Sequence, residues 1–298
     1  MMKQLLVWIA VMVWAPAAFA LSPYVVANKV APGSVRSVMA QVEAKLTHAG
    51  FRVVGRYTPV GLPQYGTVVV TDQGILNAIS AMGGATIVGA GLRVGVQSDG
   101  TVTYENPDYW LRAYFRRQFP TAQAAVAAAS NSLARALGRV RDFGGNVSAS
   151  DLPDYRYMIG MERFDDDKDQ LKTYPSFAAA VAAVNANLAK GVDHVSKVYE
   201  VSLPARSIAV FGVAMNGARS SGEAWWIKKI GADHIAALPW EIYVVGPRVY
   251  ALYGRYRIAL AWPSLGMGTF MEISSAPDDV LETLTAVAGG VYEKSSAF

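Results

Sequence analysis

The sequence predicts an α+β protein made of two tandem two-layer domains, each an antiparallel sheet with helices packed on one face. Two observations indicate this fold class. Residues 34–70 return as residues 176–212, with apolar positions opposite apolar ones, and both copies follow the order β-α-β-β-(α)-β-β-α. A repeat this long is a whole small domain rather than one turn of a solenoid. We therefore expect a two-lobed, pseudo-symmetric molecule.

The first unit is predicted to span residues 21–138. Ser34 fits the N-cap of a helix whose apolar residues recur at helical spacing, and Gly50 is a natural stop for that helix. The remaining elements are expected in this order: strands at 24–30, 51–59 and 65–71, a short helix at 73–82, a hairpin of 86–97 with 101–104 turned at Asp99-Gly100, and an Ala-rich helix at 121–138.

A linker at residues 139–153, rich in small polar residues and glycine, is expected to lead into the second unit, residues 154–298. The second unit repeats the order of the first. Its expected elements are a strand at 155–163, an acidic loop at 165–173, a helix at 176–190, strands at 192–203 and 207–215, a short helix at 224–230, a hairpin of 240–245 with 248–253, β segments at 256–262 and 269–273, and a closing helix at 278–288.

Residues 1–20 have the pattern of a secretory signal peptide. Lys3 supplies the positive start, an apolar run follows, and Ala18-Phe19-Ala20 forms a small-x-small cleavage pattern. The apolar run is shorter than the roughly 20 residues of a spanning helix, so we favour cleavage over a retained anchor. The chain has no cysteine, which suits an exported protein held by its core and excludes thiolate chemistry. The predicted location is the periplasm.

The net charge of +4 is too small to indicate a nucleic-acid partner, and no basic tract with interleaved aromatic residues occurs. Several arginines nevertheless give the first unit a basic face, which is most simply a solvated one: Arg112, Arg116, Arg117, Arg135 and Arg139.

The hairpin of the first unit resembles that of the bacterial domain-of-unknown-function 302 family. The matching residues run from Leu92-Arg93-Val94 through Asp99-Gly100 to Asn106-Pro107, after a helix that ends in Gly50-Phe51. In the second unit, Phe211-Gly212 and the stretch from Leu238-Pro239 resemble the rest of the family pattern. The resemblance implies a compact α+β domain that pairs with itself, and it implies no catalytic residue.

Patterns for metals and cofactors are weak, and no cofactor is expected. The three histidines (His48, His194 and His234) have no ligand spacing, and the alternating acids Asp165, Asp167 and Asp169 lack the Gly and Glu of a calcium loop. Gly83-Gly84 lacks the Lys and spacing of a phosphate loop and is interpreted as a turn. Copper handling through thioethers stays an alternative, with Met158, Met161, Met215, Met267 and Met271 considered.

The most promising surface is the short helix near residue 225. Trp225 and Trp226 are adjacent, so both cannot easily face the core, and Lys228 and Lys229 follow them. Such a surface suits an anionic or aromatic ligand, a partner protein or a membrane surface. The simpler alternative is one buried Trp and one that covers the rim of the sheet. His234 and Glu241 complete the predicted ligand-binding residues.

We therefore predict an exported, non-enzymatic binding or interaction protein for a small molecule or a periplasmic protein. Its two copies are expected to form an intramolecular pseudo-dimer, with a homodimer as a further possibility. The ligand is expected between the lobes or under Trp225 and Trp226. The first alternative is a periplasmic enzyme with a site between the lobes, formed by Asp233, His234 and Glu241. The second is the copper-handling protein.

Overall fold

A computed structural model of the chain describes residues 19–158, 160–164, 170–218 and 220–292. The predicted signal segment lies outside these residues except for Phe19 and Ala20. The alternating acids Asp165, Asp167 and Asp169 also lie outside them. The described chain is mixed α+β with antiparallel sheets, which confirms the predicted fold class.

The first sheet has six antiparallel strands in the order β3-β4-β5-β6-β2-β7. Their bounds are β2 Tyr24–Val26, β3 Arg52–Tyr57, β4 Tyr65–Thr71, β5 Leu92–Gln97, β6 Val102–Glu105 and β7 Arg141–Phe143. The expected linker 139–153 therefore contributes β7 to this sheet. It also contains β8 (Val147–Ser148), which pairs with β1 (Ala20–Leu21).

The second sheet has five antiparallel strands in the order β10-β11-β12-β13-β9. Their bounds are β9 Gln170–Thr173, β10 Val195–Leu203, β11 Ile208–Met215, β12 Trp240–Val245 and β13 Arg248–Ala251. Strand for strand, this order matches β3-β4-β5-β6-β2 of the first sheet. The observed topology therefore supports the predicted internal repeat.

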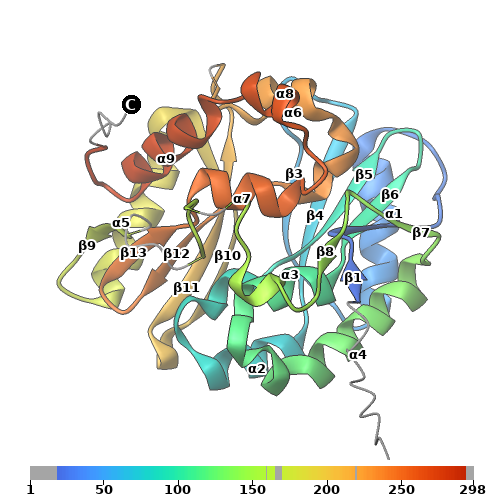
Figure 1. Cartoon of the computed structure of the whole chain (residues 1–298), viewed down its shortest axis with the longest axis horizontal. Coiled ribbons are helices and arrows are strands. Elements are labelled where there is room, and N and C mark those ends of the chain that lie inside the picture. The colour runs from blue at the N-terminus through green and yellow to red at the C-terminus, as the bar shows by residue number, and fades with distance from the viewer. Residues whose placement is uncertain (1–18, 159, 165–169, 219, 293–298) are drawn as a thin grey trace, which may run out of the picture.

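Helices pack on the outer faces of the two sheets. α1 (Val35–His48) lies on the first sheet and α5 (Phe177–Lys190) on the second, and Figure 1 shows them at opposite sides of the molecule. Ser34 and Ser176 cap these helices as predicted, each accepting a hydrogen bond from the backbone N–H three residues on, at 3.2 Å. α2 (Gln73–Met82) and α4 (Phe119–Leu137) pack together beside α1.

The inner faces of the sheets are covered reciprocally by two short 3-10 segments. η1 (Gly84–Ala90) of the first unit lies on β11 and β12, whereas η7 (Ala232–Ala237) of the second unit lies on β4, β5 and β6. Gly95 makes this approach possible, since a Cβ there would lie 2.5 Å from Ile235 and 2.9 Å from the Ala236 nitrogen. One continuous apolar core results from this exchange.

Four predicted strands differ from the structure. Residues 256–262 belong to the helix α7 (Gly254–Ala261), and residues 269–273 overlap the helix α8 (Met267–Met271). Residues 256–262 are all buried, so their apolar run carries neither the helical nor the alternating period. The described part of 155–163 contains no strand, and the predicted strand 86–97 is divided into η1 and β5.

The two units end in different ways. In the first, α3 (Pro107–Phe115) leads through η2 (Arg116–Gln118) directly into α4. In the second, residues 262–275, which include α8, separate α7 from the last helix, α9 (Ala276–Val287). This longer connection forms part of the candidate site.

Candidate functional site

An apolar pocket lies between α7, α8 and the segment 154–164, of which all residues but 159 are described. Its cavity volume is about 90 Å³, and it is partly open to solvent. Aromatic, methionine and aliphatic side chains make up most of its wall: Tyr157, Tyr256, Trp262, Phe270, Met161, Met267, Ile258, Ala259 and Leu265. We call it the α7–α8 pocket.

Ring contacts and one hydrogen bond hold the outer wall of this pocket. Tyr157 stacks on Phe270 of α8, with ring centroids 6.3 Å apart and planes inclined by 25°. The Tyr155 hydroxyl donates to the Ala259 carbonyl of α7 at 2.9 Å. The segment 154–164 is thereby attached to both helices although its described residues form no strand.

One ion pair lies in the otherwise apolar wall. Arg255 Nη1 is 3.3 Å from Glu162 Oε1; the Glu162 side chain is 8% exposed and that of Arg255 38%. The other carboxylate oxygen, Glu162 Oε2, has no hydrogen-bond partner among the described residues, and neither have the Tyr256 hydroxyl and Trp262 Nε1. Such buried polar atoms favour a ligand or water that can pair with them.

The inner end of the pocket is fixed by Trp262, which ends α7. Its ring meets Trp226 edge to face at 5.3 Å and stacks on His234 at 5.7 Å. Trp226 also meets Trp240 of β12 at 5.9 Å. Because these rings belong to the core, this end of the pocket has a rigid wall.

The two predicted tryptophans on α6 (Glu223–Ile230) have different surroundings. Trp226 is completely buried, whereas Trp225 is half-buried and lies under Lys229, whose Nζ is 4.4 Å from the ring centroid. Lys228 is exposed. This arrangement matches the simpler alternative, in which one Trp enters the core and the other covers its rim.

His234 lies in an aromatic environment on η7. Tyr24, Phe143 and Trp262 surround its ring, and Nδ1 is 2.9 Å from Asp233 Oδ1. The hydrogen bond from His234 lowers the pKa of Asp233. Its Nε2 is buried and has no partner in the described part of the chain.

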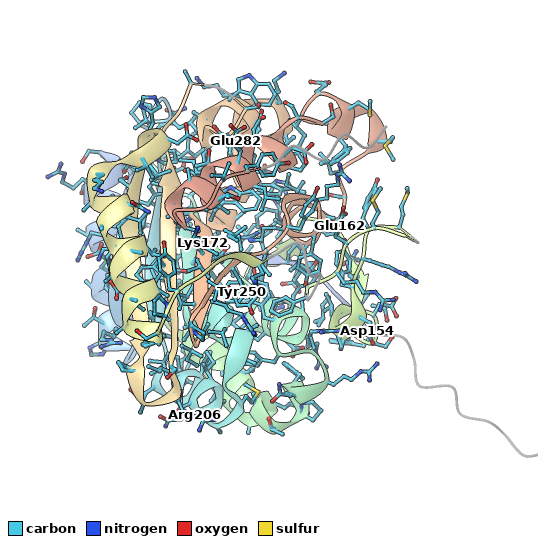
Figure 2. The ribbon with its side chains drawn as sticks, turned by 90° about the vertical axis from the view of Figure 1, so that its left-hand side faces the viewer. Asp154, Glu162, Lys172, Arg206, Tyr250 and Glu282 are labelled. Atoms are coloured by element: carbon cyan, nitrogen blue, oxygen red, sulfur yellow. The ribbon has the colours of Figure 1, made fainter. Side chains whose placement is uncertain are left out.

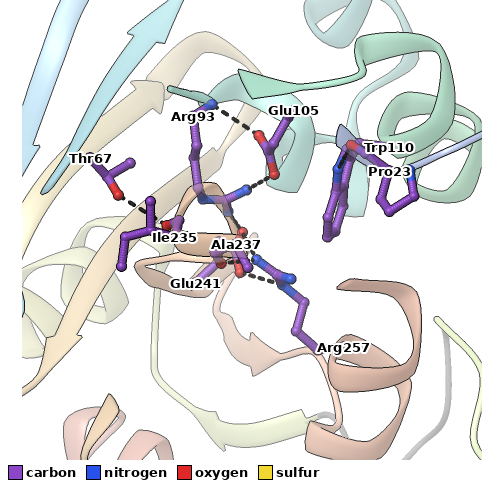
Figure 3. A network of polar contacts seen from close by, with 9 residues as sticks. All are labelled: Pro23, Thr67, Arg93, Glu105, Trp110, Ile235, Ala237, Glu241 and Arg257. Atoms are coloured by element: carbon purple, nitrogen blue, oxygen red, sulfur yellow. Dashed lines mark hydrogen bonds and ion pairs between the residues drawn. The ribbon is translucent and has the colours of Figure 1, made fainter. Parts of the chain in front are cut away.

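Glu241 belongs to a buried ion network rather than to a cluster with His234. Its Oε2 accepts from Arg257 Nε at 3.1 Å, and its Oε1 also contacts Arg93. Arg93 in turn pairs with Glu105 at 2.5 Å, so four alternating charges form a chain between the sheets (Figure 3). All four side chains are at most 2% exposed. We call this set the central ion network.

Burial and ion pairing act in opposite directions on the members of the central ion network. For Arg93, burial is the largest single influence and lowers the pKa, but Glu105 together with other neighbours raises it overall. For Glu105, burial raises the pKa despite the nearby guanidinium groups of Arg93 and Arg257. The Arg257 guanidinium lies over Trp110 at 4.7 Å and Trp240 at 5.4 Å, and it also donates to the Ala237 carbonyl. With its charges paired and out of solvent, the network joins the sheets and offers no open acid or base.

The six predicted residues thus do not form one site. Trp225, Lys228 and Lys229 lie at the surface, whereas Trp226, His234 and Glu241 lie in the interior. Of these, Trp226 and His234 touch the pocket indirectly, through Trp262. Sequence reasoning missed the pocket because its walls come from two helices predicted as strands. One signal was present: Met267 and Phe270 lie in a connection with no counterpart in the first unit.

Of the methionines considered for copper, Met161 and Met267 line the pocket, while Met158 and Met271 are 46% and 62% exposed. In the described part of the chain, no three His, Asp or Glu residues group closely enough to hold a metal ion. Nor does any helix there combine the length and apolar character needed to cross a membrane.

Comparison with known proteins gives no match to a family model, a curated protein or a solved structure. The resemblance to the domain-of-unknown-function 302 family therefore stays a prediction, supported by the sequence patterns alone.

Proposed function

We propose that the protein is a non-enzymatic binding protein that holds a small, mostly apolar molecule in the α7–α8 pocket. The observation that carries this proposal is the composition of the wall, in which four aromatic and two methionine side chains surround one ion pair. Methionine adapts to ligands of different shapes, and aromatic rings supply large contact area. Glu162 gives this wall one carboxylate that can pair with a hydroxyl or amine group of such a ligand.

The predicted periplasmic location is part of this proposal. It rests on the signal-like residues 1–20 and on the absence of cysteine. The matching strand orders and the reciprocal packing of η1 and η7 support an intramolecular pseudo-dimer. In that arrangement the central ion network supplies rigidity, and ligand binding is left to the pocket.

Titration with the neutral dye Nile red tests the proposal. Ala259→Phe places a ring in the pocket, and Ala182→Phe adds the same ring at an exposed position on α5 as a matched control. We expect saturable fluorescence enhancement for the wild type and the control, with at least about tenfold weaker binding for Ala259→Phe, a loss of about 1.4 kcal/mol. Equal dye binding by all three proteins would contradict the proposal.

A further inference from the structure

A second, polar hollow lies beside the α7–α8 pocket, beyond the segment 154–164. Its volume is about 580 Å³, and it is open to solvent. Its walls are the turn 82–86 after α2, residues 114–118 at the end of α3, and Asp154, Arg163 and Phe164. Asp154 and Glu162, which mark the two hollows, lie on the same side of the molecule in Figure 2. We call this hollow the arginine groove.

The charges of the groove are mainly positive. Among the described residues that line it, Arg116, Arg117 and Arg163 face one carboxylate, that of Asp154. Arg206 from the β10–β11 connection reaches its Gly83 end, where it donates to the Ala81 carbonyl at 3.4 Å. These arginines come from three distant parts of the chain, although the whole protein carries only +4. The fold therefore concentrates positive charge at this place.

The arginines have different roles. Arg116 has a left-handed backbone (φ 52°), and its Nε donates to the Pro153 carbonyl at 3.0 Å, which anchors the segment 154–164. Arg117 is 85% exposed, with Nη2 3.9 Å from Asp154, and Arg163 is also exposed. Arg117 and Arg163 thus keep their guanidinium groups open to a ligand.

The opposite wall offers main chain rather than side chains. Gly83 and Gly84 have φ values of 71° and 61°, a conformation that glycine adopts without strain. A Cβ at Gly84 would have nothing within 4 Å. A bulky anion can therefore enter between this turn and the arginines.

We propose that the arginine groove binds a phosphate-bearing small molecule. Arginine forks match the oxygens of phosphate with paired hydrogen bonds. Three arginines and one carboxylate among the described lining residues favour a multiply charged anion. The site is separate from the apolar pocket, because the Phe164 and Tyr256 rings, in edge contact at 6.1 Å, stand between them. The Gly83-Gly84 turn and two arginines of the basic face, Arg116 and Arg117, would thus form part of a phosphate-binding site.

Calorimetric titration of the full chain with inorganic pyrophosphate tests this site. We expect saturable binding that weakens as salt is added, because the contacts are exposed charges. Arg117→Gln and Arg163→Gln should each weaken it about tenfold, the loss expected for a hydrogen bond to a charged group. Arg135→Gln, on the exposed face of α4, is the matched control and should bind like the wild type.

Because Arg117 and Arg163 are exposed, the melting temperature of each variant should stay close to that of the wild type, which separates loss of binding from loss of fold. Arg117→Lys keeps the positive charge but loses the forked guanidinium group. Its affinity for pyrophosphate should therefore lie between those of the wild type and Arg117→Gln. Absence of pyrophosphate binding by the wild type, or an equal loss in Arg135→Gln, would overturn the proposal. Nile red binding does not depend on these residues, so either proposal can fail without the other.

Discussion

The two units have matching sheets but different surfaces where their third helices end. In the first unit, α3 passes into α4 through the three residues of η2, and arginines face a polar groove. In the second, residues 262–275 separate α7 from α9 and form one wall of an apolar pocket. The two units therefore share one sheet framework, while the length and composition of one connection set the chemistry of each unit.

The segment 154–164 connects these two surfaces. Asp154, Arg163 and Phe164 face the arginine groove, whereas Tyr157, Met161 and Glu162 face the α7–α8 pocket. Adjacent residues, Glu162 and Arg163, thus serve opposite sides of one wall. A segment without a strand can do this because ring contacts and the Tyr155 hydrogen bond hold it to the helices.

The largest loss of unfolding free energy is expected from a substitution in the central ion network, which joins the sheets of the two units. Arg257→Met leaves Glu241 with one buried partner fewer, and loss of one member of a buried ion pair costs about 3–5 kcal/mol of unfolding free energy. Arg139→Met breaks an ion pair with Asp142 in which both side chains are about 40% exposed, and it should cost less than about 1 kcal/mol. Urea unfolding measures both values. A loss below about 1 kcal/mol for Arg257→Met would show that the network does not join the sheets.

The adjacent tryptophans allow the stability contributions of a core ring and a surface ring to be compared on one helix. Trp226→Ala opens a cavity beside Trp240 and Trp262 and should lower the unfolding free energy by about 3 kcal/mol or more. Trp225→Ala removes a half-buried ring and its contact with Lys229, so the loss should be about 1 kcal/mol. Nile red binding should survive Trp225→Ala. Loss of dye binding in that variant, with its stability intact, would indicate that the dye binds at α6 and not in the α7–α8 pocket.

A smaller change in unfolding free energy is expected when the pH is raised, because of Glu223 at the start of α6. Burial raises the pKa of this carboxyl well above its usual range, and Oε1 has no partner among the described residues. The folded state therefore holds the proton more tightly than the unfolded state. This contribution is complete below the unfolded pKa of about 4.3 and is lost as the pH rises toward the folded pKa, at about 1.4 kcal/mol per pKa unit of difference.

The variant Glu223→Gln isolates this effect, since the amide keeps the shape without the charge. Unfolding free energies at pH 5 and pH 8 should differ less for the variant than for the wild type, and the variant should be the more stable at pH 8. A wild type that gains stability between these pH values relative to Glu223→Gln would show that this carboxyl is ionised without cost.

The sequence contains enough information for most of the framework. Helical spacing and the caps Ser34 and Ser176 placed α1 and α5 correctly, and the Asp99-Gly100 turn placed the first hairpin. These features are local or periodic, so they can be recognised without knowledge of the tertiary structure.

The candidate site was harder to predict because its signals are not periodic. Every residue of α7 except Arg255 is buried, which removes the pattern that separates a helix from a strand, and α8 has only five residues. The partners of Glu241 were also hidden: Arg93 lies 148 positions earlier in the chain, and only the facing of the two sheets brings them together. The sequence shows that Trp225 and Trp226 are neighbours, but it does not show which distant residues come together in the folded protein.

Hydrogen–deuterium exchange with and without Nile red tests most directly where the ligand lies. We predict slower exchange in peptides that cover Met161, Ile258 and Phe270, with little change in the α6 peptide that contains Trp225. Protection of the α6 peptide alone, with no change around α7 and α8, would contradict the account.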